Sequence, residues 1–420
     1  MAKFFGLPRV KISFVRKFVL IFVIVIASFG GGYYFGFKGF KAQFKSFNQV
    51  SLVREVPPDV NANMDLFWTV WKELGDKYFD KTKLNPQDMV YGAIQGMVAA
   101  VGDPYTMFLP PVQNKVTNED LSGSFEGVGI EIGYKGVRLA VISPLPGSPA
   151  EAAGVKPGDF IVRIKDDAKN IDESTSGISL PDAVEAIRGP AGTKVTLTLI
   201  RDGQDNPIVT DITRAKLTVP SVTLTYVGKD NSIADVKVNK FAADTDDGWN
   251  GIVEKIKENS NVKGVIVDLR NNPGGYMQGA IDLASEFIPV GGGEKSVVVI
   301  EDRGGVRTDY KVNKAGRLIG VPVVVLINGG SASASEIFAG ALRDDLGAKL
   351  VGEKSFGKGT IQEPLDLAGG SGLHITVAKW LTPDGTWVHE KGLEPDFKIG
   401  NQENASGDAQ LEAAVKLLSQ

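Results

Sequence analysis

The sequence predicts a multidomain chain that combines α+β and α/β parts. Three features lead to this prediction: an uncharged apolar stretch near the N-terminus, short alternating strands from residue 124, and alternating strands and helices beyond residue 217. The 420 residues are enough for about two to four domains. With 43% hydrophobic and 23% charged residues, the composition is typical of a globular protein with a buried core.

The composition excludes several kinds of chemistry. The chain has no cysteine, so it forms no disulfide, thiol nucleophile or thiolate zinc site. Its two histidines, His374 and His389, cannot form a three-histidine site, and no serine and carboxylate pattern surrounds them. The acids Asp235, Asp268 and Asp302 lack the spacing of metal ligands. We therefore predict no metal, no cofactor and, at a net charge of −4 without a basic stripe, no nucleic-acid partner.

The N-terminal segment predicts a membrane anchor. Basic side chains in residues 1–17 precede residues 18–37, which carry no charge. A helix of that length extends about 30 Å, the thickness of a bilayer's hydrocarbon core. The positive flank favours a cytoplasmic N-terminus, which places the rest of this single-pass chain on the extracytoplasmic side of the cell membrane. A cleaved signal peptide is the alternative, although no small-residue cleavage site follows the apolar run.

Two further segments precede residue 124. Residues 38–60 are predicted as a polar linker and residues 61–112 as a helical region. Apolar residues from Leu66 to Tyr78 keep helical spacing, and Pro86 can open a second helix. We assign this region no chemistry.

Residues 124–216 predict a separate domain of short strands. Runs such as DFIVRIKD and KVTLTLIRDG alternate or are rich in β-branched residues. Two helices interrupt the strands. Ser148 caps the first, and residues 180–188 form the second, which Gly189 ends.

Residues 217–400 predict a layered α/β core. Continuous apolar strands such as GVIVDLR and PVVVLI alternate there with amphipathic helices, one of which can start at Asp246. The tail, residues 401–420, carries a further amphipathic helix from Ala409 to Leu418.

A serine-rich junction is the first candidate for chemistry. The strand at 322–327 runs into residues 328–336, NGGSASASE, and a helix follows. Backbone N–H groups are free at such a junction and the helix dipole is positive, so an oxyanion formed there would be stabilised by the N–H of the next residue. The alternative is a serine that only caps the helix.

The second candidate is GEKSFGKGT at 352–360. It nearly matches a phosphate-binding loop, but Gly359 stands where Ser or Thr should hold magnesium. The functional alternative is Lys358, held between two glycines on a tight turn. Burial would have to lower its pKa by about 3 units for it to act as a base at pH 7. Such a lysine can deprotonate a serine.

SASASE (331–336) followed by FGKGTIQ (356–362) resembles the C-terminal processing peptidases, also called tail-specific proteases. The resemblance continues in the family's order through AIRGPAGT (186–193), LTPDG (381–385) and KGLEPD (391–396), so it covers most of the chain. It implies that residues 217–400 form a serine protease core similar to the crotonase and ClpP folds.

The resemblance also implies the roles of individual residues. Ser333 is the nucleophile, Lys358 its general base, and Gln362 the residue that orients the amine. The oxyanion hole is formed by the N–H of Ala334 and by a backbone N–H of Gly274 or Gly275, a choice that the sequence leaves open. Glu336 and Asp344 match acidic positions that support the nucleophile's helix.

Residues 124–216 look like a PDZ domain. The loop Gly127, Val128, Gly129 and Ile130 would receive a peptide C-terminus while the peptide adds as a β-strand. The segment SPAEAAGVKPGD (148–159) is typical of bacterial PDZ modules. Arg188 matches an arginine that couples the PDZ position to the active site in regulated members; the alternative is a cation at the C-terminus of a helix.

The resemblance as a whole implies a membrane-anchored serine endopeptidase that acts on protein or peptide substrates with free C-termini. It further implies homodimerisation through the terminal helices. Two alternatives come from other classes. One is a non-catalytic, membrane-tethered PDZ scaffold or chaperone, and the other is a crotonase-type acyl-CoA enzyme, which an exported location and an attached PDZ domain disfavour.

Overall fold

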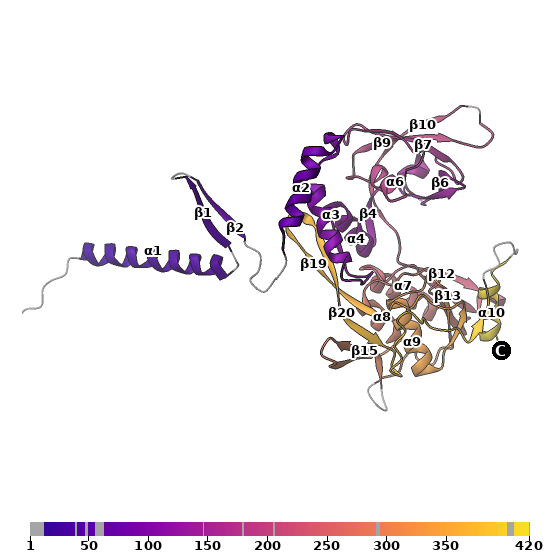
Figure 1. Cartoon of the computed structure of the whole chain (residues 1–420). Coiled ribbons are helices and arrows are strands. Elements are labelled where there is room, and N and C mark those ends of the chain that lie inside the picture. The colour runs from indigo at the N-terminus through magenta and orange to yellow at the C-terminus, as the bar shows by residue number, and fades with distance from the viewer. Residues whose placement is uncertain are drawn as a thin grey trace, which may run out of the picture. The chain divides into compact units, whose positions relative to one another are not determined.

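The computed structural model describes residues 12–37, 40–46, 49–54, 63–145, 147–178, 180–204, 206–290, 295–400 and 407–419. The chain divides into two units, residues 1–89 and residues 90–420 (Figure 1).

The first unit is mainly helical. Its elements are α1 (Ile12–Phe37), β1 (Phe40–Ser46), β2 (Gln49–Arg54), α2 (Asp65–Lys77), η1 (Lys81–Lys83) and the start of α3 (Pro86–Ala99). Most of the predicted cytoplasmic segment, residues 1–11, lies outside the described residues. Within the part of the chain that is described, no helix combines the length and the hydropathy needed to cross a membrane.

The predicted linker at 38–60 contains an antiparallel hairpin, which corrects the sequence prediction. Strands β1 and β2 pair from Phe40 opposite Arg54 to Ser46 opposite Gln49. The segments FKAQFKS and QVSLVR carry the alternation of apolar and polar residues that favours strands, a period that their polar composition obscured.

The second unit contains the predicted PDZ domain as one antiparallel sheet with the strand order β10-β9-β7-β6-β5, and β8 pairs with β7 (Figure 1). The elements are β5 (Ile130–Lys135), β6 (Arg138–Pro144), α5 (Pro149–Ala152), β7 (Phe160–Asp166), β8 (Ile171–Ser174), α6 (Leu180–Ile187), β9 (Lys194–Ile200) and β10 (Ile208–Thr213). The Ser148 hydroxyl accepts the Glu151 N–H and caps α5, as predicted.

The chain enters and leaves this domain through paired strands. β4 (Ser124–Gly127) and β11 (Ala215–Thr218) are antiparallel neighbours. Before β4 lies α4 (Pro111–Ser122), which the sequence did not predict because its residues are largely polar and lack a clear apolar face. Its ends follow ordinary rules, with proline at the first helical position and Gly123 in the left-handed conformation after the last.

The predicted core is a layered α/β structure, as expected. Its sheet has the order β12-β13-β14-β17-β18-β21, in which β13 to β21 are parallel and β12 is antiparallel to β13. The elements are β12 (Val222–Val227), η2 (Lys229–Asn231), β13 (Ile233–Val238), α7 (Thr245–Glu258), β14 (Gly264–Asp268), α8 (Met277–Ala284), β17 (Val323–Ile327), α9 (Ala334–Leu346), β18 (Lys349–Gly352), β21 (Phe397–Lys398) and α10 (Ala409–Leu418).

Alternate residues of the central strands bury themselves on opposite faces of this sheet. In β14, Val265 and Val267 join the core formed with α7, α8 and α9, whereas Ile266 joins the smaller core under α10. Both faces are therefore covered by helices (Figure 1), which explains why the strands read as continuous apolar runs.

A second sheet has the order β16-β15-β20-β19, and β3 pairs with β20. The strands are β3 (Met107–Leu109), β15 (Ser296–Asp302), β16 (Arg307–Lys311), β19 (Thr360–Asp366) and β20 (Gly372–Leu381), with η3 (Ala368–Gly370) between the last two. The predicted helical region 61–112 thus includes a strand. The pairing of β3 with β20 attaches residues 107–109 to the core, a long-range contact that local sequence patterns do not encode.

One half-buried acid on the central sheet makes the stability of the fold depend on pH. Asp235 lies on β13, and its Oδ1 atom has no hydrogen-bond partner among the residues that the structure describes. Burial, followed by the nearby Asp268 carboxylate, raises the pKa of Asp235 from 3.8 to about 6. The folded state therefore holds this proton more tightly than the unfolded chain. The contribution of the Asp235 carboxyl to the free energy of unfolding therefore falls as the pH rises from about 4 to about 6.

Asp235→Asn removes the charge at pH 7, so we expect the free energy of unfolding to rise by about 1 to 2 kcal/mol at that pH, after allowance for solvent screening. Below pH 4 the gain should vanish. Urea unfolding followed by fluorescence of the buried tryptophans measures both values, with Asp309→Asn at an exposed position of β16 as the control. An equal effect of Asp235→Asn at pH 4 and pH 7 would contradict the assignment.

Candidate active site

Three loops meet at one edge of the central sheet. β14, β17 and β18 are adjacent parallel strands, so the loops that follow them emerge side by side at their carboxyl ends. The three loops and β19 line a common cavity of about 430 Å³, which brings together most of the residues predicted from the sequence. Its lining includes Gly274, Gly275, Ser333, Lys358, Gln362 and His374.

The structure distinguishes the three serines of SASASE. Ser331 and Ser335 are fully buried, and their hydroxyls donate to the carbonyls of Leu269 at 2.8 Å and Asn272 at 2.9 Å. Ser333 lines the cavity instead. It precedes α9 with φ 55° and ψ −115°, a strained conformation for a residue with a side chain. Ser333 is therefore the serine of the triplet that can meet a ligand.

The glycine loop lies against the nucleophile. A Cβ atom added to Gly274 would lie 2.8 Å from the Ser333 Cβ and 3.1 Å from the Ala334 nitrogen, so only glycine fits. The Gly274 N–H already donates to the Asn272 side chain at 2.9 Å. Among the described residues, the N–H groups of Gly275 and Ala334 have no acceptor. Of the two glycines left open by the sequence, the hydrogen bonds favour Gly275 as the partner of Ala334 in an oxyanion hole.

Lys358 lies between two glycines that pack closely on the segment around residues 388–392. A Cβ atom added to Gly357 would lie 2.8 Å from the backbone nitrogen of Gly392. One added to Gly359 would lie 2.7 Å from the backbone nitrogen of His389. The Lys358 carbonyl accepts the indole N–H of Trp380 at 2.9 Å. The backbone of the lysine is thus fixed on both sides.

The Lys358 amine is desolvated, as a basic role requires. Burial lowers the pKa of Lys358, and the Asp103 carboxylate opposes this shift. Nζ lies 5.0 Å from the centre of the Tyr105 ring. In the part of the chain that the structure describes, no hydrogen bond joins this amine to the Ser333 hydroxyl.

A single buried carboxylate connects the nucleophile's helix to the lysine loop. Glu336 is 1% exposed. Its Oε2 accepts the backbone N–H groups of Ser333 and Lys358, both at 2.9 Å. Its Oε1 accepts the Gly357 N–H at 2.7 Å and the Ser355 hydroxyl at 2.6 Å. Burial raises the pKa of this carboxyl, although each of the hydrogen bonds lowers it.

Gln362 lines the cavity, but its recorded bonds go elsewhere. Its amide nitrogen donates to the hydroxyls of Thr360 at 2.9 Å and Thr376 at 3.2 Å. No hydrogen bond joins it to the Lys358 amine among the described residues. Its predicted role in orienting that amine stays a prediction.

Sequence reasoning missed several residues around the lysine. Asp103 and Tyr105 belong to the predicted helical region 61–112, to which no chemistry was assigned, and His374 was assigned no relation to the site. Burial, followed by the charge of Lys358, lowers the pKa of His374. Nothing local signals these contacts, because they follow from the pairing of β20 with β19 and with β3. Among the residues described, no group of three or more potential metal ligands occurs.

The PDZ loop has free donors. The carbonyls of Val128 and Gly129 accept the N–H groups of Ala150 and Leu145, both at 2.9 Å. The N–H groups of Val128 and Gly129 have no acceptor in the described part of the chain. Gly129 has φ 78°, and an added Cβ would lie 2.4 Å from the Ser148 Cβ. The loop can therefore offer N–H groups to an anion.

Arg188 lies between the PDZ domain and α4. Its guanidinium is 3.7 Å from Glu119 and 3.6 Å from Asp120, and it lies over the ring of Phe125. Asp120 also pairs with Lys240 at 3.2 Å and lines the cavity that contains Ser333. Arg188 therefore contacts acids of α4 and does not only end a helix.

Comparison with known proteins places the chain in a family. Residues 232–399 match the profile of Peptidase family S41, and residues 141–201 match that of a PDZ domain. The carboxy-terminal processing protease CtpA of Bacillus subtilis is 37% identical over 80% of this chain and 69% of its own length. This chain belongs to peptidase family S41. It is a serine peptidase of the CtpA-like, carboxy-terminal processing group and carries a PDZ domain, as the sequence predicted.

Other relatives agree with this family assignment. A CtpA-like serine protease of Staphylococcus aureus is 38% identical over 80% of this chain and 65% of its own length. The solved photosystem II D1 C-terminal processing protease is 30% identical, with a TM-score of 0.50 over 84% of this chain and 96% of that one. An S41 protease from Bacteroides fragilis shares the fold at 16% identity, with a TM-score of 0.53 over 87% of this chain and 98% of that one.

Glu336→Gln tests the connection between the two loops. Glutamine keeps the size but replaces one acceptor oxygen by a donor, so two of the four donors that bond to this carboxylate lose their acceptor. An unsatisfied buried donor costs about 1 to 3 kcal/mol, so we expect the kcat of peptide cleavage to fall by at least about tenfold while KM changes little. Steady-state kinetics measure this, with Glu258→Gln on the exposed end of α7 as the control. Unchanged kcat in Glu336→Gln would refute the role.

Proposed function

We propose that this S41 peptidase is an endopeptidase that binds protein C-terminal tails through its PDZ domain and cleaves them with Ser333 and Lys358. The observation that carries the proposal is the cavity at the carboxyl ends of β14, β17 and β18. It combines a strained serine, a desolvated lysine and, beside them, the free N–H groups of Gly275 and Ala334.

In the acylation step, the Ser333 oxygen attacks the carbonyl carbon of the substrate, and the Lys358 amine takes the hydroxyl proton. The carbonyl oxygen becomes an oxyanion that accepts the N–H groups of Ala334 and Gly275. When the tetrahedral intermediate collapses, the peptide C–N bond breaks and Lys358 returns the proton to the leaving amine. The product is an ester between Ser333 and the acyl half of the substrate.

In the deacylation step, Lys358 accepts a proton from water, which attacks the ester carbonyl. The same N–H groups stabilise the second oxyanion. The Ser333 oxygen leaves and receives the proton from Lys358, so the enzyme returns to its initial state and a carboxylic acid is released. Neither step needs a metal or an organic cofactor.

Tail binding is supported by the position of β5. This strand is at the edge of the PDZ sheet, so its free side can pair with an added strand. The N–H groups of Val128 and Gly129, which have no acceptor among the described residues, lie just before β5 and can donate to a terminal carboxylate. Ile130 and Ile132 of β5 pack partly buried on the domain's apolar core, which favours tails with apolar side chains.

Arg188 is proposed to couple tail binding to catalysis. It follows α6, whose movement on tail binding would change its ion pairs with Glu119 and Asp120 of α4. Asp120 lines the catalytic cavity, so such a change would reach the site through one residue.

The location at the cell membrane is also a proposal, and it rests on the basic segment 1–17 and the uncharged residues 18–37. Fractionation of cells that produce the full chain, with protease added outside the membrane, would test it. Recovery of the peptidase domain in the cytosol would rule the proposal out. Homodimerisation and the likeness of the core to the crotonase and ClpP folds stay predictions of the sequence.

Ser333→Ala and Lys358→Ala should each abolish peptide cleavage while leaving the fold intact. In the parent enzyme, kcat/KM should rise as the pH rises through the pKa of Lys358, because only the neutral amine can accept a proton. Burial lowers that pKa, so the rise should come below the range of an ordinary lysine. Hydrolysis of a fluorogenic peptide from pH 5.5 to 10 measures both effects.

Lys354→Ala is the matched control for the lysine. Lys354 belongs to the same loop but pairs with Glu394 at 3.0 Å on the surface, so its loss should leave the rate unchanged. Cleavage retained by the Ser333→Ala protein would falsify the proposed nucleophile. Inhibition by a metal chelator would contradict the metal-free mechanism.

Amidation of a substrate's C-terminus should weaken its cleavage. A carboxylate that accepts N–H groups contributes about 1.5 to 3 kcal/mol, so KM should rise by about tenfold or more. Paired peptides that differ only at the terminus provide the comparison, and equal KM values would exclude tail recognition by the carboxylate.

The Arg188→Ala variant should bind the free tail as well as the parent does, but the free tail should no longer stimulate its cleavage activity.

A further inference from the structure

The catalytic lysine has an unusual environment for a cation. In the portion of the chain that is described, the Lys358 amine makes no hydrogen bond and no ion pair, and the face of the Tyr105 ring, with its centre 5.0 Å away, is its recorded partner. An aromatic face attracts an ammonium group without the strong stabilisation that a carboxylate would give. This contact is outside the roles assigned above.

Tyr105 is held in place by a hydrogen-bonded turn at residues 103–106. Asp103 accepts the Tyr105 N–H at 3.0 Å and the Thr106 hydroxyl at 2.6 Å. The Thr106 hydroxyl in turn accepts the N–H of Thr376 on β20 at 3.0 Å. Because Gln362 donates to the Thr376 hydroxyl, the turn is connected to the wall of the catalytic cavity.

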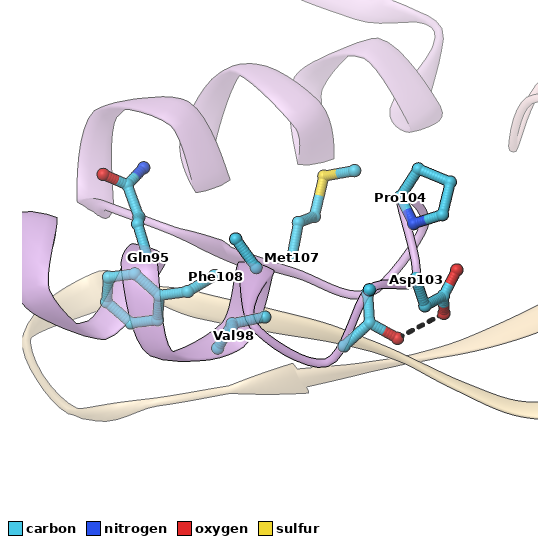
Figure 2. Close-up of a pocket in the computed structure, with 9 residues that line it drawn as sticks. Gln95, Val98, Asp103, Pro104, Met107 and Phe108 are labelled. Atoms are coloured by element: carbon cyan, nitrogen blue, oxygen red, sulfur yellow. Dashed lines mark hydrogen bonds between the residues drawn. The ribbon is translucent and has the colours of Figure 1, made fainter.

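Packing fixes the ring from a second side. The Tyr105 ring lies edge to face with His389, at 6.1 Å between centres, and His389 stacks on Trp387 at 5.0 Å. Trp387 donates to the carbonyl of Gly359, next to the lysine. The turn also borders a pocket of about 400 Å³, in which Figure 2 shows Asp103 and Pro104 beside Val98 and Met107.

We propose that Tyr105 is a positioning residue for Lys358: its ring covers the amine, excludes water from it and holds it ready to face Ser333. The inference rests on the proposed function, because it assumes that Lys358 is the base. Tyr105 makes no contact with the substrate in this proposal and acts only through the lysine.

The charged and titratable groups around the amine and the Tyr105 ring come from several elements. They are Asp103 and Tyr105 of the turn, Glu336 of α9, His374 of β20, His389 and Glu390 of the segment after β20, and Asp120 and Lys240 at the cavity wall. Among these, Asp103 raises the pKa of Lys358, whereas burial lowers it and is the larger effect.

The direction of the expected change follows from these two effects. Loss of the ring admits water, so the pKa of Lys358 should rise toward its ordinary value and less of the amine is neutral at pH 7. Loss of the cation–π attraction acts in the opposite direction, but the amine is only half-buried and lies 5.0 Å from the ring centre, so this attraction is weaker than the effect of admitting water. Desolvation should therefore dominate, and the acidic limb of kcat/KM should move to higher pH.

The test compares Tyr105→Ala with Tyr105→Phe in the full chain, with fluorogenic peptide hydrolysis from pH 5.5 to 10. We expect Tyr105→Ala to lose about tenfold in kcat/KM at pH 7, with its acidic limb about one pH unit higher, and to regain most activity at high pH. Tyr105→Phe keeps the ring face, so its profile should match the parent. Tyr310→Ala, at a partly exposed position of β16, is the control for loss of a tyrosine ring.

A loss by the same factor at every pH would show that Tyr105 is merely structural and would overturn the inference. If Tyr105→Ala does not fold, Thr106→Val decides: it releases the turn from Thr376 and Asp103 but keeps the ring, and the acidic limb should still move up. An unmoved limb in that variant counts against the proposal. Activity retained by Lys358→Ala would instead refute the proposed function itself, so the two failures are distinguishable.

Discussion

The geometry of the site depends on the buried carboxylate of Glu336. It accepts the backbone N–H of residue 333 at the start of α9 and those of residues 357 and 358 in the lysine loop. In the sequence, α9 and β18 separate these two segments. A charge buried this deeply is tolerable only if its oxygens are fully hydrogen-bonded. The same hydrogen bonds that satisfy the carboxylate also hold the two backbone segments together. They therefore fix the separation between the serine and the lysine.

The parallel sheet makes this meeting of loops possible. Loops after neighbouring parallel strands emerge at one edge, so β14, β17 and β18 supply the glycine loop, the nucleophile and the base. The close approach of these loops leaves no room for side chains. A Cβ at Gly275 would lie 2.1 Å from the carbonyl oxygen of Phe241, and one at Gly274 would contact Ser333. The glycines of NNPGG are therefore required by packing as well as by the need for free N–H groups.

Local patterns in the sequence predicted the elements better than their contacts. The apolar runs, the caps and the glycines indicated the central strands and α9, and the resemblance to tail-specific proteases assigned roles to the residues that follow these strands. Pairings over long distances were missed. Nothing near Met107 or Tyr105 in the sequence indicates that β3 pairs with β20 or that a ring reaches the lysine. The choice between Gly274 and Gly275 also needed the structure, because it depends on the hydrogen bond that Asn272 makes.

The turn at residues 103–106 keeps the Asp103 carboxylate from pairing with Lys358. A carboxylate that paired directly with Lys358 would keep the amine protonated and prevent it from acting as a base. Asp103 lies near enough to raise that pKa, yet its oxygens accept the Tyr105 N–H and the Thr106 hydroxyl, and it forms no ion pair with the amine in the described part of the chain. The same bonds that occupy the acid place the Tyr105 ring on the amine. The turn thus keeps the Asp103 carboxylate from forming an ion pair with the Lys358 amine and places the weaker Tyr105 ring against it instead. Burial can therefore lower the pKa of Lys358.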